Sequence, residues 1–236
     1  HPKVFEWIAD IRKKNGDVGI GINPASLHER ISQRLIESRP NSITISFPSI
    51  HKEIFEKLCP TITFEDALKR TQELVDLSRE NAGVRIAGIK TDINSDESEQ
   101  FAGFWNELDI RADMTICHGR GGNLKDSDIY GPKAFGLDSE MCGLFQFHTF
   151  VTWEADVLAC CHDLTGATSI GNLVNDTVSV IAERKQNTLK DSMPFPVCRQ
   201  CDEPLRYYPS PQGPPPKSRK ERIRFFRSIS REKISL

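Results

Sequence analysis

The residues of this chain whose types and spacing could do chemistry are its seven cysteines. They stand at positions 59, 117, 142, 160, 161, 198 and 201, so five of the seven lie after residue 140. An odd number of cysteines in a sequence without a secretory signal argues against a disulfide framework. The cysteines of the C-terminal part therefore indicate ligation of a metal ion or cluster.

Four of these cysteines fit one tetrahedral thiolate site: Cys142, Cys160, Cys198 and Cys201. The Cys198-x-x-Cys201 pair brings two thiolates within reach of one metal on a tight loop. We expect Cys160 to close a hairpin strand and Cys142 to precede that hairpin, so that the fold returns them to one place. A set of four thiolates suits zinc and an iron–sulfur cluster equally.

The other cysteines receive different interpretations. Cys161 adjoins Cys160, and neighbouring residues of a strand point to opposite faces, so only one of the two should face the metal. Cys59 precedes a proline at a helix end and Cys117 lies in an apolar strand, so both are predicted to be packing residues. His162 and Asp163 follow the cysteine pair and are candidates for a hydrogen bond to a ligand sulfur.

The first half of the chain alternates helical and strand patterns about four times. Helices are predicted over 2–14, 27–38, 64–80 and 95–108, and strands over 18–23, 42–47, 84–91 and 114–118. Short apolar strands joined by helices predict an α/β fold with a parallel sheet and right-handed crossovers. Four strands cannot close an eight-stranded barrel, so residues 1–123 are predicted to form an open sheet or a partial β/α barrel.

The second part has a different pattern and is predicted to be a small α+β domain spanning residues 124–208. Residues 145–153 alternate as a strand does, residues 154–155 suit a turn, and residues 156–161 suit a return strand. These segments predict a β-hairpin. Asn175 or Asp176 is expected to cap a helix over 178–189.

Composition excludes several classes of protein. The chain has 236 residues with 31 Lys and Arg against 33 Asp and Glu, a net charge of −2, so neither a globally basic nucleic-acid binder nor an acidic disordered protein is expected. No apolar run is long enough for a membrane span and there is no secretory signal, which predicts a cytoplasmic location. Residues 209–236, with five prolines followed by a basic stretch, are predicted to be a disordered tail.

The cysteine-rich part resembles a known extension. The segment 153–163 (WEADVLACCHD), the segment 170–173 (IGNL) and the final CxxC resemble, in order and spacing, the SPASM/twitch extension of radical S-adenosylmethionine (SAM) enzymes. Ala155 stands where the pattern has glycine, and no cysteine follows Cys201. The resemblance is therefore to the shorter twitch type, which implies one auxiliary [4Fe–4S] cluster held by the four cysteines proposed above.

The N-terminal part is similar to the second half of a radical SAM partial barrel, through its start at His1-Pro2 and through Gly119–Leu124. This resemblance implies that SAM binds at the carboxyl ends of the strands. Ser46 matches a family serine that approaches the SAM ribose, although Phe47-Pro48 replaces the acidic residue often found after it. The other strand-end candidates are Asn23, Lys90 with Thr91, and His118 with Arg120.

The resemblance implies a function as well. Radical SAM chemistry needs a CxxxCxxC loop, which this sequence lacks, so we expect the chain to be the C-terminal portion of a longer enzyme. The expected role is binding of an auxiliary cluster that supports radical oxidation or modification of a small-molecule or peptide substrate, with flavodoxin or ferredoxin as electron donor. The alternatives are a non-enzymatic binding module stapled by zinc and a SAM-independent partner subunit.

Overall fold

The computed structural model describes residues 1–78, 82–124, 127, 142–190 and 195–202. The chain divides into two compact units, and the boundary along the chain falls between Cys117 and His118. The predicted tail over 209–236 lies outside the described residues. Within them, no helix combines the length and the apolar character needed to cross a bilayer.

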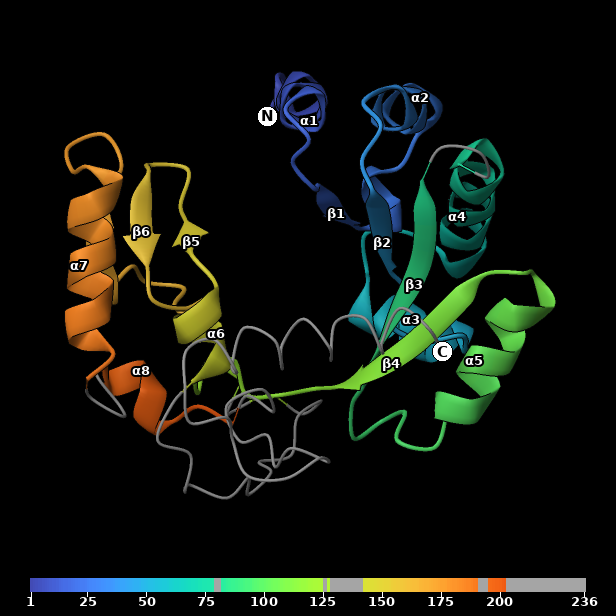
Figure 1. Ribbon diagram of the computed structural model, residues 1–236. Helices are drawn as coiled ribbons and strands as arrows, with labels where there is room; N and C mark the ends of the chain where they lie inside the picture. Colours follow the sequence, from blue (N-terminus) through green and yellow to red (C-terminus); the bar gives the residue numbers. More distant parts are fainter. Residues whose placement is uncertain (79–81, 125–126, 128–141, 191–194, 203–236) are drawn as a thin grey trace, which may run out of the picture. The chain divides into compact units, whose positions relative to one another are not determined.

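The first unit is built on a parallel sheet of four strands in the order β1-β2-β3-β4 (Figure 1). The strands are β1 (Gly19–Ile22), β2 (Ser42–Ser46), β3 (Gly83–Lys90) and β4 (Arg111–Ile116). The helices are α1 (Val4–Lys13), the short 3-10 helix η1 (Pro24–Ser26), α2 (Glu29–Glu37), α3 (Lys52–Leu58), α4 (Phe64–Ser78) and α5 (Ser98–Glu107). This architecture confirms the predicted α/β fold with an open parallel sheet.

Buried strand residues and an aromatic cluster form the core of this unit. Ile43, Ile45 and Ile86 are fully buried on the two central strands. Phe47, directly after β2, packs against Phe55 of α3 and Trp105 of α5, with ring centroids 4.5 and 4.9 Å apart. Such aromatic pairs contribute about 0.5–1.5 kcal/mol each beyond the burial of their surface.

The first unit departs from the sequence prediction in a few places. Helix α3 ends at Leu58 with Cys59 as its C-terminal capping residue, which agrees with the helix end expected there, although its bounds were not predicted; its Phe55 is fully buried. Helix α5 begins after Glu97 and not after Ser95, because the Glu97 carboxylate turns back to accept hydrogen bonds from the Ser49 hydroxyl (2.8 Å) and the Ile50 amide. The predicted start of the helix at residue 64 is confirmed for α4, which Thr63 caps: its Oγ1 accepts from the Asp66 amide at 3.2 Å.

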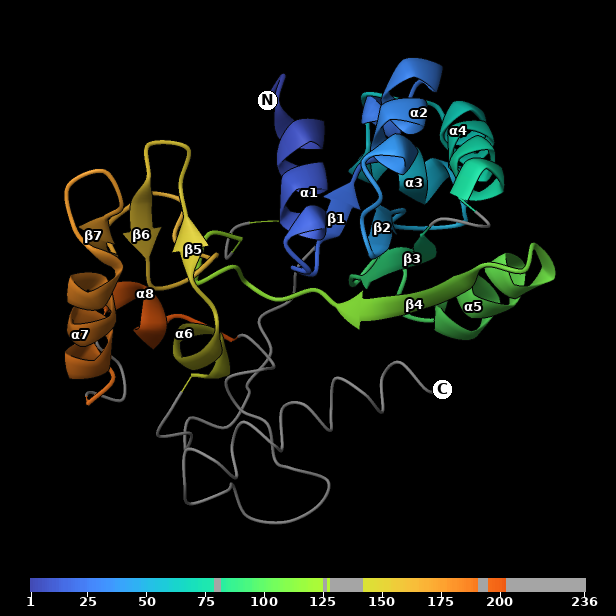
Figure 2. The same cartoon turned by 45° about the horizontal axis from the view of Figure 1, so that its top comes forward.

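The second unit contains a three-stranded antiparallel sheet in the order β5-β6-β7 (Figure 2). Its elements are α6 (Gly143–Phe147), β5 (Phe150–Val151), β6 (Asp156–Leu158), β7 (Ser169–Asn172), α7 (Val178–Thr188) and α8 (Pro196–Arg199). Its core consists of Phe145, Val157, Ala159, Ile170 and Ile181. The predicted hairpin is confirmed as β5 and β6, and β7 adds a third strand.

Two details of the second unit were predicted wrongly. The strand expected over 145–153 is shortened to Phe150–Val151, and residues 143–147 form a helix whose Phe145 is buried in the core. The alternating pattern of residues 145–153 predicted a strand, but a short run of apolar residues suits one turn of a helix equally well. The cap of α7 is Thr177, whose hydroxyl accepts from the Val180 amide, and not Asn175 or Asp176.

The sheet packing of the first unit leaves no room at Gly88. A Cβ atom there would lie 2.7 Å from Phe101 Cζ and 2.8 Å from Met114 Cγ, whereas Gly103 on the exposed face of α5 has nothing within 4 Å. We expect Gly88→Ala to destabilise the protein by about 1–3 kcal/mol through overpacking, and Gly103→Ala to stabilise it by roughly 0.5–1 kcal/mol. Chemical denaturation checks both, and an unchanged midpoint for Gly88→Ala would contradict the packing described.

Candidate metal centre

The cysteine pair of the second unit lies in a turn that directly follows β6. Residues 160–163 form this turn, closed by a hydrogen bond from the Asp163 amide to the Cys160 carbonyl at 3.3 Å. The two sulfurs and a ring nitrogen of His162 all lie within 4.8 Å of one another. The expectation that Cys160 and Cys161 point to opposite faces is therefore wrong, because β6 ends at Leu158 and strand alternation does not extend to them.

Hydrogen bonds control the protonation of the pair. The backbone amide of His162 donates to Cys160 Sγ at 3.3 Å, and Cys161 Sγ lies 3.9 Å from His162 Nδ1. The hydrogen bond between the two thiols, followed by burial, raises the pKa of Cys160. The same hydrogen bond, together with His162, lowers the pKa of Cys161 to about 4. These shifts favour the thiolate, the form of cysteine that ligates metals, at Cys161 and oppose it at Cys160.

Asp163 fixes the chain that follows the turn. Its carboxylate accepts five hydrogen bonds, two from Thr165, one from the Gly166 amide and two from Thr168, at 2.7–3.0 Å. Burial raises the pKa of Asp163, but the hydrogen bonds from Thr168 and Thr165 outweigh it and lower the pKa to about 2. Asp163 therefore holds the loop, while the contact to the Cys160 sulfur comes from the His162 amide.

The second cysteine segment follows Phe195. Helix α8 carries Cys198, and Cys201 lies two residues beyond its end. Cys142 precedes α6 as its N-terminal capping residue, and its charge adds to the rise in the pKa of Cys160. The four predicted ligands, Cys142, Cys160, Cys198 and Cys201, thus belong to one unit and all are half-buried.

A loop over residues 118–124, which we call the connector loop, contacts both cysteine segments. Toward the second segment, the Gly119 amide donates to Asp202 Oδ1 at 2.6 Å. Toward the first, Asn123 Nδ2 donates to the His162 carbonyl at 3.1 Å, and the His118 ring meets the buried His162 ring edge-on at 4.5 Å. The connector loop therefore places the Cys160 turn beside the Cys198–Cys201 segment.

Glycines allow the connector loop to approach both cysteine segments closely. A Cβ atom at Gly121 would clash with Val197 Cγ2 on α8 and would lie 3.5 Å from His162 Cβ on the first segment. Gly121 and Gly122 also have φ angles of +65° and +90°, which favour glycine. The sequence shows these glycines but does not show what they contact, so the role of the connector loop was not predicted.

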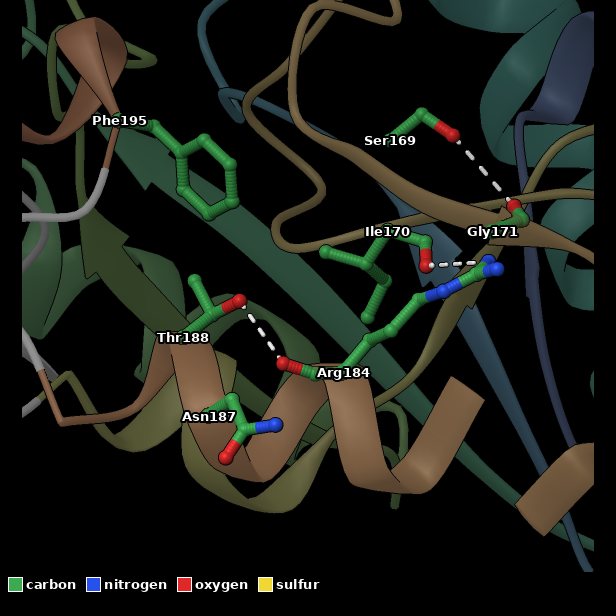
Figure 3. Close-up of a pocket in the computed structure, with 7 residues that line it drawn as sticks. All are labelled: Ser169, Ile170, Gly171, Arg184, Asn187, Thr188 and Phe195. Carbon is green, nitrogen blue, oxygen red and sulfur yellow. Dashed lines mark hydrogen bonds between the residues drawn. The ribbon is translucent and has the colours of Figure 1, made fainter. Parts of the chain in front are cut away.

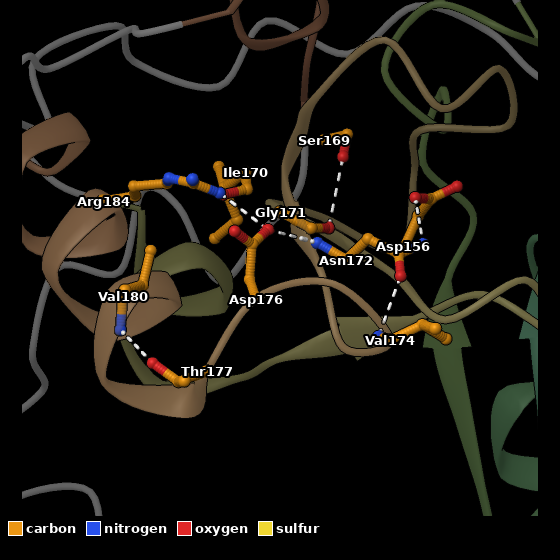
Figure 4. A network of polar contacts seen from close by, with 10 residues as sticks. All are labelled: Asp156, Ser169, Ile170, Gly171, Asn172, Val174, Asp176, Thr177, Val180 and Arg184. Carbon is orange, nitrogen blue, oxygen red and sulfur yellow. Dashed lines mark hydrogen bonds and ion pairs between the residues drawn. The ribbon is translucent and has the colours of Figure 1, made fainter.

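The sequence segment Ile170-Gly-Asn172 lies in β7, and its hydrogen bonds connect this strand to the start of α7 and to the hairpin (Figure 4). The Asn172 side-chain amide donates to the Glu154 carbonyl at 3.0 Å and to Asp156 Oδ1 at 2.9 Å, which closes the hairpin turn. Its backbone amide donates to Asp176 Oδ2 at 2.9 Å, and Asp176 pairs with Arg184 at 2.8 Å. These bonds hold the sheet that presents the cysteine turn.

A shallow pocket of about 520 Å³ lies between β7, α7 and the start of α8 (Figure 3). Its lining residues are Ser169, Ile170, Gly171, Arg184, Asn187, Thr188 and Phe195. Arg184 is the charged residue of this lining, and it already donates to the Ile170 carbonyl and to Asp176. The pocket contains no cysteine and is separate from the candidate metal centre.

The predicted SAM-binding residues share one edge of the parallel sheet. Asn23 follows β1, Ser46 ends β2 and Lys90 ends β3, and parallel pairing brings these carboxyl ends to the same side. Asn23 Oδ1 accepts from the Ala25 amide at 2.8 Å and so begins η1, whereas Ser46 is exposed and Lys90 half-buried. Thr91 is buried and bonded to Asn94. Contacts of Asn23, Ser46 and Lys90 with SAM stay predictions.

Comparison with known proteins supports both parts of this description. The family model of the SPASM domain, an iron–sulfur cluster-binding domain, matches residues 142–202. No curated protein sequence matches the chain. Among solved structures, two of anSMEcpe, a radical SAM enzyme of the anaerobic sulfatase-maturating type, are similar to this chain. The structure with bound AdoMet and Kp18Cys peptide has a TM-score of 0.55 at 14% identity, and the match covers 88% of this chain and 70% of that one. The structure with AdoMet alone has a TM-score of 0.57 at 13% identity, and the match covers 87% and 69%.

These similarities concern the fold and one part of the chain. The chain shares the fold of these solved radical SAM structures, and residues 142–202 match the model of the SPASM domain, as the sequence resemblance predicted. The types of residue present suit a cluster, although among the described residues the donor atoms grouped within 4.8 Å are those of Cys160, Cys161 and His162, and this group does not include Cys142, Cys198 or Cys201. Thiols from both segments lie within the matched residues, no disulfide joins the cysteines of the described residues, and an amide already donates to one sulfur.

Loss of the Asp163 charge should loosen the loop that follows the cysteine turn. Hydrogen bonds to charged groups contribute about 1.5–3 kcal/mol, so we expect Asp163→Asn to lower the free energy of unfolding by about that amount at pH 7. Because the folded pKa lies below the unfolded value of about 3.9, this stability is present above pH 4 and is lost as the pH falls toward 2. Denaturation of the wild type and of Asp163→Asn at pH 7 and pH 2.5 measures this stability. A difference in unfolding free energy between the two proteins that is equally large at both pH values would contradict this role of Asp163.

The hairpin turn stores strain at Ala155, whose φ of +69° lies in the left-handed region. We expect Ala155→Gly to stabilise the protein by about 1 kcal/mol, because glycine adopts this conformation without steric cost. Gly166→Ala is the matched control, since Gly166 has φ +78° and open space around it, and it should destabilise by a similar amount. Thermal unfolding checks both variants, and a lower melting temperature for Ala155→Gly would refute the strain.

Proposed function

We propose that this chain is a portion of a radical SAM enzyme in which the SPASM unit holds one auxiliary [4Fe–4S] cluster. Its ligands would be Cys142, Cys160, Cys198 and Cys201. The observation that carries the proposal is the connector loop, which contacts the Cys160 turn and the Cys198–Cys201 segment at once. This shared contact between two cysteine segments distant in sequence supports one common centre. When bound, such a cluster supplies one-electron redox chemistry.

The chain's own residues prepare this centre. The His162 amide donates to Cys160 Sγ, and such bonds to a ligand sulfur orient it and raise the reduction potential of the centre. The His162 side chain is 2% exposed, so it excludes water from one side of the turn. Asp163 keeps the turn in place through its bonds to the loop over 165–168.

The parallel sheet would provide the rest of the active site. We assign SAM to its carboxyl edge, with Asn23, Ser46 and Lys90 as contacts, because β/α folds bind substrates at that edge. The CxxxCxxC motif for the SAM-cleaving cluster is not in this sequence, so the proposal requires that motif to come from outside these residues. A structural neighbour was crystallised with a peptide, which favours radical modification of a peptide, with electrons from a flavodoxin or ferredoxin.

Anaerobic purification of the chain tests the cluster proposal. We expect a brown protein with absorbance near 400 nm and about four iron atoms per chain. Substitution of Cys198 and Cys201 by alanine should remove most of the colour and iron, because each change deletes a ligand. Cys59→Ala is the matched control, since Cys59 belongs to the first unit, and it should leave the iron content unchanged.

Two results would contradict the proposal. A colourless chain with one bound zinc ion would show instead that the four cysteines form a structural zinc site, which is the function of a binding module. Loss of iron in Cys59→Ala with full iron in Cys198→Ala would show that the ligands are assigned to the wrong cysteines.

A further inference from the structure

We propose that Cys161 is a substitute ligand for the cluster, able to bind the iron that Cys160 normally holds. This inference rests on the proposed function and deepens it. It concerns Cys161, whose thiol the four proposed ligands leave unused. The site would then contain five sulfurs able to bind iron.

The positions of the donor atoms carry this inference. Cys160 Sγ, Cys161 Sγ and a His162 ring nitrogen lie within 4.8 Å of one another. Two thiolates that share one tetrahedral metal, with bonds of about 2.3 Å, lie roughly 3.8 Å apart. An iron bound to Cys160 is therefore also close to Cys161. Each iron of a cluster takes one terminal thiolate, so the two sulfurs compete for the same iron.

Contacts within the chain hold the turn that carries both sulfurs. The Asp163 amide closes the backbone onto the Cys160 carbonyl, and the Asp163 carboxylate anchors the next five residues. The buried His162 ring, held against His118, lies 3.9 Å from Cys161 Sγ. Exchange of one sulfur for the other thus requires a side-chain rotation and no rearrangement of the backbone.

A backbone hydrogen bond distinguishes the two sulfurs. Cys160 Sγ accepts from the His162 amide, whereas Cys161 Sγ lies against the His162 ring. A sulfur that accepts a fixed backbone hydrogen bond is the better-oriented ligand, and a metal displaces the thiol proton of whichever cysteine it binds. We therefore assign Cys160 as the resident ligand and Cys161 as the one that replaces it when Cys160 is lost.

The experiment compares Cys160→Ala, Cys161→Ala and the double variant in the full chain, purified anaerobically. Iron per chain and the electron paramagnetic resonance spectrum of the reduced cluster are measured for each. We expect Cys161→Ala to keep the wild-type iron content and spectrum. Cys160→Ala should keep at least half of the iron with a shifted spectrum, and the double variant should lose iron at least fivefold relative to Cys160→Ala.

The two proposals fail in different ways. If the wild-type chain binds no iron, the proposed function fails. If the wild type is loaded but Cys160→Ala holds as little iron as the double variant, the substitute-ligand inference is overturned while the cluster stands. Should the alanine variant not fold, Cys160→Val and Cys160→Val/Cys161→Val repeat the comparison with a side chain that cannot bind iron, and equal iron in that pair also overturns the inference.

Discussion

The second unit depends on one constraint, which is that the connector loop must contact two cysteine segments at the same time. The Gly119 amide binds Asp202, directly after Cys201, and the Asn123 side chain binds the carbonyl of His162, directly after the cysteine pair. Gly121 lies between Val197 and His162, where a larger side chain would clash. If these contacts were lost, the two segments would lose the loop that contacts both of them.

The rest of the unit supports this arrangement. A three-stranded sheet of few residues buries a small core, so its rigidity comes from polar contacts as well as from packing. Asn172 closes the hairpin turn, Asp176 with Arg184 ties β7 to α7, and Asp163 fixes the loop after the cysteines. The Asn172 contact satisfies the Glu154 carbonyl, and the Asp163 carboxylate satisfies the backbone amides of Thr165, Gly166 and Thr168. These contacts order the cysteine turn through the chain's own groups, which lowers the entropic cost of forming the site.

Much of this molecule could be predicted from its sequence, because its strongest signals are local. The four parallel strands, the hairpin and the SPASM resemblance follow from apolar periodicity and cysteine spacing. The helix over 143–147 could not be predicted, because Phe145 joins the core through tertiary contacts. The position of Cys161 was missed because where a strand ends depends on its pairing, and β6 ends at Leu158. The ligand set and the SAM contacts remain predictions, since they depend on groups that the chain must bind.

The central claim is that sulfurs from both cysteine segments bind one iron–sulfur cluster. Anomalous diffraction at the iron edge, from crystals of the anaerobically purified chain, tests it most directly. The account predicts one compact iron signal in the second unit, with sulfurs of the Cys160 turn and of Cys198 and Cys201 at about 2.3 Å from iron. A signal bound to only one of the two segments, or a single ion with a zinc absorption edge, would contradict it.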